Sequence, residues 1–437
     1  MRYLYIHNFR GFSETLVPLK RLTFLLGENS TGKTSLLKLL YVMYKPLFWF
    51  DPAYGLEEAA RDAEVDLRNY RDVVSAWSSD KSSLRVGILQ TNRANKQSRI
   101  SCAFAVYTFR NDNGTPYAFR YAQFNHDLLT QIERRERLTK YKTTQERGTF
   151  PDETKAVRFF RRAIRRHARD THGFAVLKDV PPRPPLAFAL GRLADAQRGA
   201  KRAGRHLKID VPFGLENFVW QGPIRTRPQR FYDATKRAFS PEGEHTPDLL
   251  RRQLRLRTKS KPFVRKLSAF GRASGLFQTV RTHSFGGGPQ APFEVLVAFR
   301  GAKLNLTNVG YGVTQILPLI VECLCRPKGH WFGVQQPEIH LHPRAQAALG
   351  DLIAELAVEK RFHFLVETHS EFLVDRCRLS LAKRKRPPDA QVLFFERTPS
   401  GNKVTALPIA HDGKYPSTQP AAFKDFFVKE EMKLLEL

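Results

Sequence analysis

The stretch GENSTGKTS, residues 27–35, decides the fold of this chain. It matches the spacing Gly-x4-Gly-Lys-Thr, in which glycines let backbone N–H groups point inward around a phosphate. The segment LKRLTFLLG (19–27) precedes it as a predicted strand, and TSLLKLLYVMYKPL (34–47) follows with apolar residues at helical spacing. A glycine-rich loop between a strand and a helix predicts a phosphate-binding loop.

In such a loop Lys33 supplies a fixed positive charge, and the Thr34 hydroxyl is a ligand for Mg²⁺. We therefore predict that this loop binds the phosphates of a nucleotide together with Mg²⁺. The predicted binding residues are Gly27, Asn29, Ser30, Thr31, Gly32, Lys33, Thr34 and Ser35.

A second part of the same fold follows residue 290. The apolar segments FEVLVAF, HWFGV and RFHFLVE read as strands, and GVTQILPLIVECL and PRAQAALGDLIAELA read as helices between them. Such alternation predicts an α/β fold with a parallel sheet. The nucleotide fold is therefore expected to be split, with other residues inserted between its halves.

The charge of the chain is concentrated in the segment between these halves. The 437 residues include 72 Lys and Arg and 42 Asp and Glu, which gives a net charge of +30. Residues 126–280 hold 35 of these basic residues and 15 of the acidic ones. Contact with nucleic acid explains such an imbalance, since neutralising phosphates releases counterions. An acidic protein partner, or a basic surface without a specific partner, are the alternatives.

Within the basic segment, AVRFFRRAIRRHARD (156–170) predicts an amphipathic helix. Phe159, Phe160, Ala163, Ile164 and His167 fall on one face of it. The predicted nucleic-acid-binding residues lie on the other face and are Arg158, Arg162, Arg165 and Arg169. The clusters QRGAKRAGRHLK (197–208) and LLRRQLRLRTKSKPFVRK (249–266) add further basic side chains.

These observations predict four parts of the chain. We expect the first half of the nucleotide fold over residues 1–125, a basic and mostly helical insertion over 126–280, the second half over 281–405, and a small extension over 406–437.

The cellular compartment is predicted from sequence features that are absent. Its four cysteines form no CxxC pair, no apolar run reaches the roughly 18 residues of a membrane span, and the N-terminus has no signal-peptide pattern. We expect a cytoplasmic protein without a membrane segment.

Two further segments carry candidate site residues. In LTNVGYGVTQILPLI (306–320), Gly310, Gly312, Thr314 and Gln315 open an apolar helix, and a glycine-rich helix start is either an anion site or a simple turn. In FLVETHSE (364–371), His369 follows a strand at the ligand-binding edge of a parallel sheet, where it can bond a phosphate or the attacking water.

The segment QQPEIHLHP (335–343) follows the predicted strand WFGV. His340 and His342 are two residues apart with no acids or cysteines clustered around them, which makes a poor metal site. The two glutamines, Gln335 and Gln336, stand where a nucleotide hydrolase needs acidic side chains.

Taken together, the chain resembles the ABC-type ATPases of the SMC and OLD kind, and in particular compact ATPases of bacterial anti-phage defence systems such as the Septu and retron-associated ATPases. NFRGF (8–12) is similar to their opening strand and turn, and GENSTGKTS to their Walker A loop. WQGPIRTRP (220–228), NVGYGVTQILP, QPEIHLHP and ETHSE are similar to their later motifs, and the C-terminal segment is loosely similar to a small domain of that group.

The resemblance implies a head-to-head dimer that closes around ATP, with Lys33 and Thr34 of one subunit facing Gly310–Gln315 of the other. It implies DNA handling, or control of an effector such as a nuclease encoded nearby, in anti-phage defence. The alternatives are an ATP-dependent scaffold that binds an acidic protein and a DNA repair or processing ATPase. A transporter ATPase fits the long basic insertion poorly.

The resemblance also implies an acid at position 335, which anchors Mg²⁺ and which Gln335 replaces, and in many members a Glu at position 336 that activates water. Three accounts are open: an engineered Glu→Gln trap, a natural change to an ATP sensor, or a transfer of the role to Glu338 or Glu367. With Gln335, Gln336 and His369 as the candidate catalytic residues, we predict an ATPase that binds ATP·Mg²⁺ and turns it over very slowly.

Overall fold

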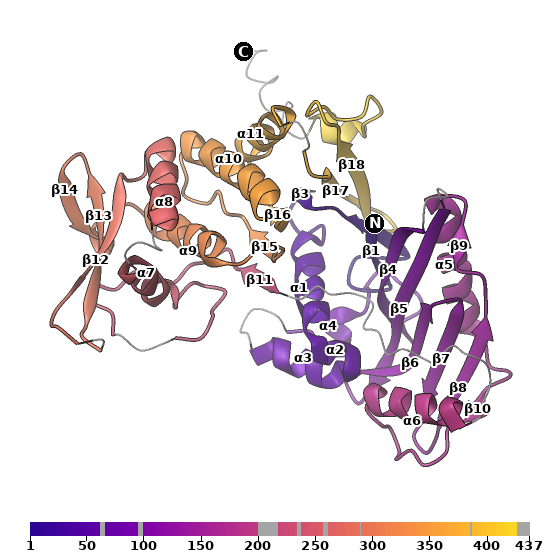
Figure 1. Ribbon diagram of the computed structural model, residues 1–437. Coiled ribbons are helices and arrows are strands. Elements are labelled where there is room, and N and C mark those ends of the chain that lie inside the picture. The colour runs from indigo at the N-terminus through magenta and orange to yellow at the C-terminus, as the bar shows by residue number, and fades with distance from the viewer. Residues whose placement is uncertain are drawn as a thin grey trace. The chain divides into compact units, whose positions relative to one another are not determined.

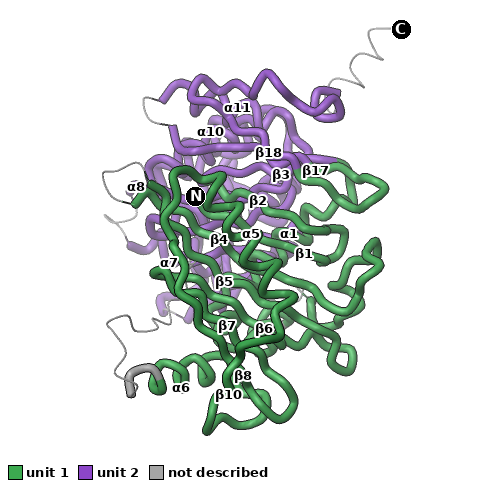
Figure 2. Tube along the Cα trace, turned by 90° about the vertical axis from the view of Figure 1, so that its right-hand side faces the viewer, with its two compact units in different colours: residues 1–20, 28–216, 395–404 green, residues 21–27, 217–394, 405–437 purple. Residues whose placement is uncertain are grey.

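A computed structural model describes residues 1–61, 66–94, 99–199, 217–233, 237–256, 261–288, 290–384 and 387–425 (Figure 1). The chain forms two compact units (Figure 2): unit 1 is residues 1–20, 28–216 and 395–404, and unit 2 is residues 21–27, 217–394 and 405–437. Parts of the predicted basic clusters, residues 200–208 and 257–260, and residues 426–437 of the predicted extension lie outside the described residues.

Unit 1 contains a nine-stranded antiparallel sheet with the order β10-β8-β7-β6-β5-β4-β1-β2, and β9 pairs with β5. The strands are β1 (Arg2–His7), β2 (Thr15–Leu19), β4 (Leu84–Ala94), β5 (Arg99–Asp112), β6 (Thr115–Asn125), β7 (Leu128–Arg134), β8 (Thr139–Gln145), β9 (Thr149–Phe150) and β10 (Ala175–Val176).

Helices pack on both faces of this sheet because its central strands carry apolar residues on both sides. On one face, Phe160 of α5 contacts Phe104 of β5 at 5.1 Å between ring centroids. On the other, Phe48 of α2 contacts Tyr107 of the same strand at 5.6 Å. The helices of unit 1 are α1 (Lys33–Tyr44), α2 (Pro46–Phe50), α3 (Pro52–Arg61), α4 (Tyr70–Val73), α5 (Glu153–Arg169) and α6 (Leu186–Gly199).

The amphipathic helix predicted from residue 156 is confirmed as α5. The side chain of Asp152 caps its first turn by accepting a hydrogen bond from the Lys155 N–H at 2.8 Å. All five residues of the predicted apolar face are buried, including His167, which is 1% exposed. The arginines on the opposite face of α5 are exposed to solvent.

Unit 2 contains a six-stranded sheet with the order β11-β15-β16-β3-β17-β18, in which β11, β15, β16 and β3 run parallel. The predicted α/β class is confirmed by these strands and the helices between them. They are β3 (Leu22–Gly27), β11 (Phe218–Gln221), β15 (Trp331–Gln335), β16 (His363–Glu367), β17 (Ala390–Thr398) and β18 (Gly401–Ile409), the last two of which include residues assigned to unit 1.

A separate antiparallel sheet of unit 2 has the order β12-β13-β14. Its strands are β12 (Thr279–Ser284), β13 (Phe293–Phe299) and β14 (Ala302–Asn305). The helices of unit 2 are α7 (Thr246–Arg255), α8 (Lys261–Ser274), α9 (Tyr311–Cys325), α10 (Pro343–Glu359) and α11 (Glu371–Ala382), with a 3₁₀ turn at Leu306–Asn308.

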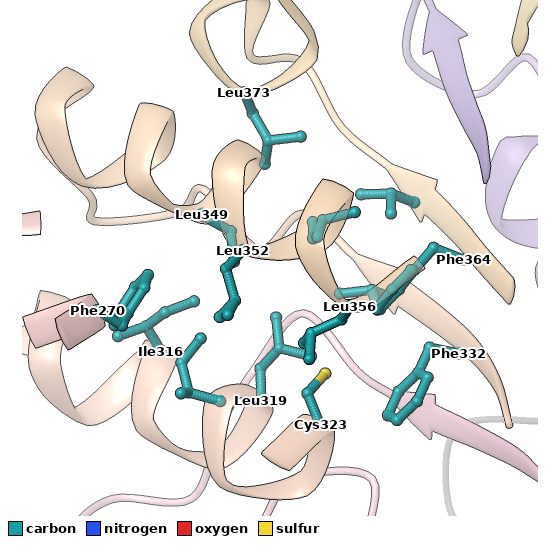
Figure 3. Close-up of a cluster of buried hydrophobic side chains, with 14 of the residues drawn as sticks. Phe270, Ile316, Leu319, Cys323, Phe332, Leu349, Leu352, Leu356, Phe364 and Leu373 are labelled. Carbon is teal, nitrogen blue, oxygen red and sulfur yellow. The ribbon is translucent and has the colours of Figure 1, made fainter. Parts of the chain in front are cut away.

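The core of unit 2 joins the parallel sheet to its helices (Figure 3). Leu352 and Leu356 of α10 point into the same space as Leu319 of α9 and the rings of Phe332 and Phe364. Leu319, Leu356 and both rings are at most 2% exposed. Burial of this kind contributes about 1.5–3 kcal/mol for each large side chain, so this core fixes the strands that carry the candidate site.

The span 126–280, predicted as one mostly helical insertion, differs in the structure. It holds α5 to α8, but it also contributes five whole strands, from β7 to β11, and the start of β12, and it divides between the two units after residue 216. These strands were not predicted from the sequence, because β7 and β8 carry Glu, Arg and Lys side chains that interrupt the alternation of apolar and polar residues typical of a strand.

Among the described residues, no helix combines the length and the apolar character that a membrane crossing requires.

We predict that acid destabilises unit 1 through His167, whose pKa burial lowers from 6.5 to about 3. Below pH 6.5 the unfolded chain binds this proton and the folded chain does not, so stability falls as the pH decreases. Replacing His167 with Leu should shrink the loss of stability between pH 7.5 and 5.5 by about 1 kcal/mol, as measured by denaturant unfolding.

The exposed His172 offers a matched histidine replacement for comparison. The loss of stability between pH 7.5 and 5.5 should be smaller in His167→Leu than in His172→Gln. An equal pH dependence in the protein and in His167→Leu would refute the assignment.

Candidate functional site

The loop that follows β3 has the backbone of a phosphate cradle. Three of its residues adopt positive φ angles: 136° at Gly27, 60° at Ser30 and 95° at Gly32. At Gly32 a Cβ atom would also lie 2.5 Å from the Phe12 ring, so glycine is required there for both reasons. The loop then enters α1, whose first turn contains no acidic residue.

The cationic side chain of this loop, Lys33, is hydrogen-bonded to the backbone of the loop. Lys33 is 3% exposed, and its Nζ donates a hydrogen bond to the Glu28 carbonyl oxygen at 2.6 Å. The Thr31 hydroxyl donates to the same carbonyl at 2.7 Å. A buried cation beside backbone N–H groups at a helix start is an anion site by charge and by geometry.

Two arginines that lie near this loop were not predicted from the sequence. The guanidinium of Arg10, within NFRGF, donates to the Ser35 hydroxyl at 2.9 Å, and that of Arg397 on β17 donates to the Ser30 carbonyl at 2.6 Å. Arg10 lies within the segment NFRGF, so this motif could have identified it as a residue near the loop. Arg397 lies far from the loop along the chain, and no local pattern marks it.

A second group of site residues lies at the carboxyl edge of the parallel sheet of unit 2. Glu367 ends β16 and lies in register between Gln335 of β15 and Leu25 of β3. The Gln335 side chain donates its amide N–H to Glu367 Oε2 at 3.2 Å, and both side chains are 5% exposed. This edge therefore carries one carboxylate and one amide in direct contact.

The loops beyond this edge are bonded to each other. The Glu338 carboxylate accepts a hydrogen bond from the His369 backbone N–H at 2.7 Å, and Gln336, with φ 40°, donates its N–H to the Glu367 carbonyl at 2.7 Å. Burial raises the pKa of the Glu338 carboxyl, and the bond from His369 opposes the shift. A carboxyl with a raised pKa is suited to accept and return a proton. The His369 side chain is exposed to solvent.

The start of α9 lies against the same loop. Gly310 is its N-cap residue, and a Cβ atom on Gly312 would lie 2.9 Å from the His340 carbonyl oxygen. The Thr314 hydroxyl donates to the Tyr311 carbonyl at 3.0 Å and is part of a buried side chain, whereas Gln315 is half-buried. Gly310 is thus the most exposed of the four predicted residues here, Gly312 and Gln315 are half-buried, and Thr314 is buried.

The two histidines after the glutamines have structural partners. His342 caps α10, accepting a hydrogen bond at Nδ1 from the Arg344 N–H, and the His340 ring lies 5.8 Å from that of Tyr311. Among the described residues, no group of three or more His, Cys, Asp or Glu side chains is arranged to hold a metal ion.

The predicted nucleic-acid-binding arginines are all exposed on α5 in unit 1. Arg165 pairs with Glu14 at 2.9 Å. For Arg158, Arg162 and Arg169, the described residues include no carboxylate within ion-pair distance. Their charge is therefore available to a polyanion.

The side chains present suit ATP and Mg²⁺ in chemical terms. In unit 1 the loop offers a buried ammonium group and the Thr34 hydroxyl. In unit 2, taken by itself, the sheet edge offers the Glu367 carboxylate and the Gln335 amide oxygen. Hydroxyl, carboxylate and amide oxygens are the ligands that Mg²⁺ prefers.

We predict that Gln335→Glu destabilises unit 2, because two buried carboxylates would then face each other where an amide donates to Glu367. The expected loss is about 2 kcal/mol at pH 8, as measured by denaturant unfolding without Mg²⁺. It should shrink at pH 5.5, where one proton can be shared between the two side chains.

Gln336→Glu is the matched control, since residue 336 adds the same charge without pairing in register with Glu367. If the two variants lose the same stability at pH 8, the contact between Gln335 and Glu367 does not determine the effect.

The comparisons with known proteins give a family. The family described as "AAA domain, putative AbiEii toxin, Type IV TA system" matches residues 22–375. Among curated proteins, no match is found.

Solved structures of SMC heads are similar to the chain at low identity. The Smc head bound to the C-winged helix domain of ScpA is 14% identical, with 93% of this chain and 97% of that chain covered and a TM-score of 0.39. The SMC head domain from Thermotoga maritima is 11% identical, with coverage of 93% and 99% and a TM-score of 0.37.

The family match includes β3, the glycine-rich loop, the start of α9 and the edge formed by β15 and β16. Each feature of the candidate site described above thus falls inside it, apart from Arg10 and Arg397. The chain belongs to this AAA domain family of ATPases.

Proposed function

We propose that the protein is an ABC-type ATPase that binds ATP·Mg²⁺, dimerises around it and hydrolyses it slowly, and that it acts as a nucleic-acid-linked regulator of an effector in anti-phage defence. The observation that carries the proposal is the buried Lys33 inside the glycine-rich loop at the start of α1. A buried ammonium group at a helix start, within a glycine-rich loop, favours a polyanion such as the triphosphate of ATP.

The Glu28 carbonyl oxygen holds the Lys33 side chain in place by accepting a hydrogen bond from Nζ. Its hydrogen bond to Nζ, and that of Thr31 to the same oxygen, keep the loop in a conformation that leaves the start of α1 available to phosphate. Such preorganisation supports tight binding because little order has to be gained when the nucleotide enters. Mg²⁺, when bound, would neutralise phosphate charge beside Thr34.

Slow turnover is proposed from the two glutamines. Gln335 and Gln336 cannot accept a proton from water, and the ordinary general base of a nucleotide hydrolase is an acidic side chain. Of the three accounts of Gln335, the contact with Glu367 supports the transfer of the carboxylate to the neighbouring strand. Glu338, whose pKa is raised by burial, is then the nearest acid in sequence to the glutamines.

Dimerisation is proposed from the start of α9. Tyr311 is 62% exposed, Gly310 leaves the first backbone N–H groups uncovered by a side-chain cap, and the first turn holds no acid. An exposed helix start of this kind favours the γ-phosphate of a nucleotide bound to a second copy of the chain. Gly310 and Gln315 are the residues that we expect to reach it.

The link to nucleic acid is proposed from the net charge of +30 and the exposed arginines of α5. A nuclease encoded nearby is the effector that we propose. A scaffold that binds an acidic protein is the second candidate, and the same arginines support it. A DNA repair or processing role remains the third.

We predict that Lys33→Ala weakens ATP binding at least tenfold, because the charge that faces the phosphates is lost. Equilibrium binding of a fluorescent ATP analogue with Mg²⁺ measures the effect. Lys38→Ala changes a half-buried lysine further along α1 and should bind as the unchanged protein does. Equal affinity of Lys33→Ala and the protein would contradict the proposed site.

A further inference from the structure

An exposed aromatic cluster lies on unit 2, and none of its rings belongs to the candidate site or to α5. Phe231 is 51% exposed and Phe285, directly after β12, is 46% exposed. Their rings meet edge to face at 5.2 Å, and the His283 ring meets Phe285 at 5.0 Å in the same manner. Burial of these adjacent exposed rings would be favourable, so we expect a ligand to cover them.

The cluster is held by the backbone. Tyr232 and Phe293 exchange two backbone hydrogen bonds of 2.8 and 3.0 Å, and the Phe285 N–H donates to the Pro292 carbonyl at 2.9 Å. The inward Tyr232 ring packs on Phe293 at 5.6 Å, which leaves Phe231 on the outward side of the same segment. The exposed rings are therefore fixed in position before any ligand binds.

Positive charge surrounds these rings. Arg281, His283 and Phe285 follow the period of two along β12 and are all exposed. The Arg230 guanidinium lies 6.0 Å from the centre of the Phe231 ring. Within the described residues, neither Arg230 nor Arg281 pairs with a carboxylate.

Two acids belong to the same segments as the cluster. Glu294 is the register partner of His283 on β13, and its carboxylate accepts a hydrogen bond from the Asn305 side chain at 2.8 Å. Asp233 is exposed two residues after Phe231. The Arg255 guanidinium donates to the Ser284 hydroxyl at 3.5 Å, so Arg230, Arg255 and Arg281 together outnumber these two carboxylates.

We propose that Phe231, His283 and Phe285, with Arg230 and Arg281, form a stacking platform for a single-stranded nucleic acid. Bases stack on aromatic rings irrespective of sequence, and arginines beside the rings pair with the phosphates. A duplex keeps its bases stacked inside and offers no free base faces to such rings. The alternation of rings with arginines, rather than with aliphatic side chains, favours a nucleic acid over an apolar protein surface.

This inference rests on the proposed function for one point, that the partner is a nucleic acid. It adds which form is bound and a second contact, on unit 2, that does not involve α5 of unit 1. It is independent of ATP hydrolysis.

The test measures the affinity of the full chain for a fluorescent oligothymidylate of about 20 nucleotides and for a duplex of the same length. Phe231→Ala with Phe285→Ala should weaken single-strand binding at least about tenfold, given the strength of base stacking. The salt dependence of binding should stay unchanged, since no phosphate contact is lost. Duplex binding should change less than twofold.

Two control variants make the result specific. Phe231→Tyr with Phe285→Tyr keeps both rings and should retain most of the affinity for the single strand. Phe188→Ala removes a ring of α6 that is 44% exposed, and it should have no effect. Thermal unfolding of each variant verifies the fold.

A variant with Ala at Arg158, Arg162, Arg165 and Arg169 separates the platform from the proposed function. It should weaken binding to both forms and reduce the salt slope by up to about four. If this variant loses binding but the Phe→Ala pair does not, the platform is refuted and the proposed nucleic-acid link stands. If the Phe→Ala pair instead changes self-association in sedimentation, the rings are a contact between copies, and the platform is refuted as well.

Discussion

Parallel pairing of β15, β16 and β3 is the constraint on which the candidate site depends. Because parallel strands end at one edge, the pairing places Gln335, Glu367 and the beginning of the glycine-rich loop at neighbouring strand ends. The buried contacts between α9, α10 and this sheet hold those ends in register (Figure 3). A slip of one residue between β15 and β16 would place Gln335 and Glu367 on opposite faces of the sheet and separate the two side chains.

The contact between Gln335 and Glu367 changes how the missing acid is understood. Position 335 carries no charge, but the neighbouring strand supplies a carboxylate in register with it, and the amide of Gln335 orients that carboxylate. The sheet edge thus keeps an oxygen ligand suited to a hard cation. Among the described residues, no acid forms a hydrogen bond with the Gln336 side chain, and the carboxylate of Glu338, further along the loop, is engaged by the His369 N–H.

The sequence predicted the phosphate loop, the α/β class of its second half and the buried face of α5, because each rests on a local pattern with a clear period. It did not predict the division into two units, since strands β7 and β8 of the basic segment have charged residues on them. Arg397 and the register of Gln335 with Glu367 depend on pairings between distant segments, which no local pattern contains. Gly312 was predicted as a nucleotide-binding residue, and the structure gives it a packing reason as well, the close approach of α9 to the His340 carbonyl.

Among the described residues, exposed arginines gather on two kinds of surface. On α5 the arginines project from a helix whose other face is buried, a form suited to phosphates of any nucleic acid. Around Phe231 and Phe285 the arginines accompany exposed rings, a form suited to unpaired bases. The two surfaces belong to different units, so a partner that engages both would connect the two halves of the chain.

The most direct test of the account is a single-turnover measurement of ATP hydrolysis with Mg²⁺, in the protein and in Gln336→Glu. The account predicts that the protein retains bound ATP with a hydrolysis rate far below the roughly 10 s⁻¹ of a typical enzyme, and that Gln336→Glu accelerates the step by an order of magnitude or more. Hydrolysis by the protein itself at about 1 s⁻¹ or faster, unchanged in Gln336→Glu, would contradict it.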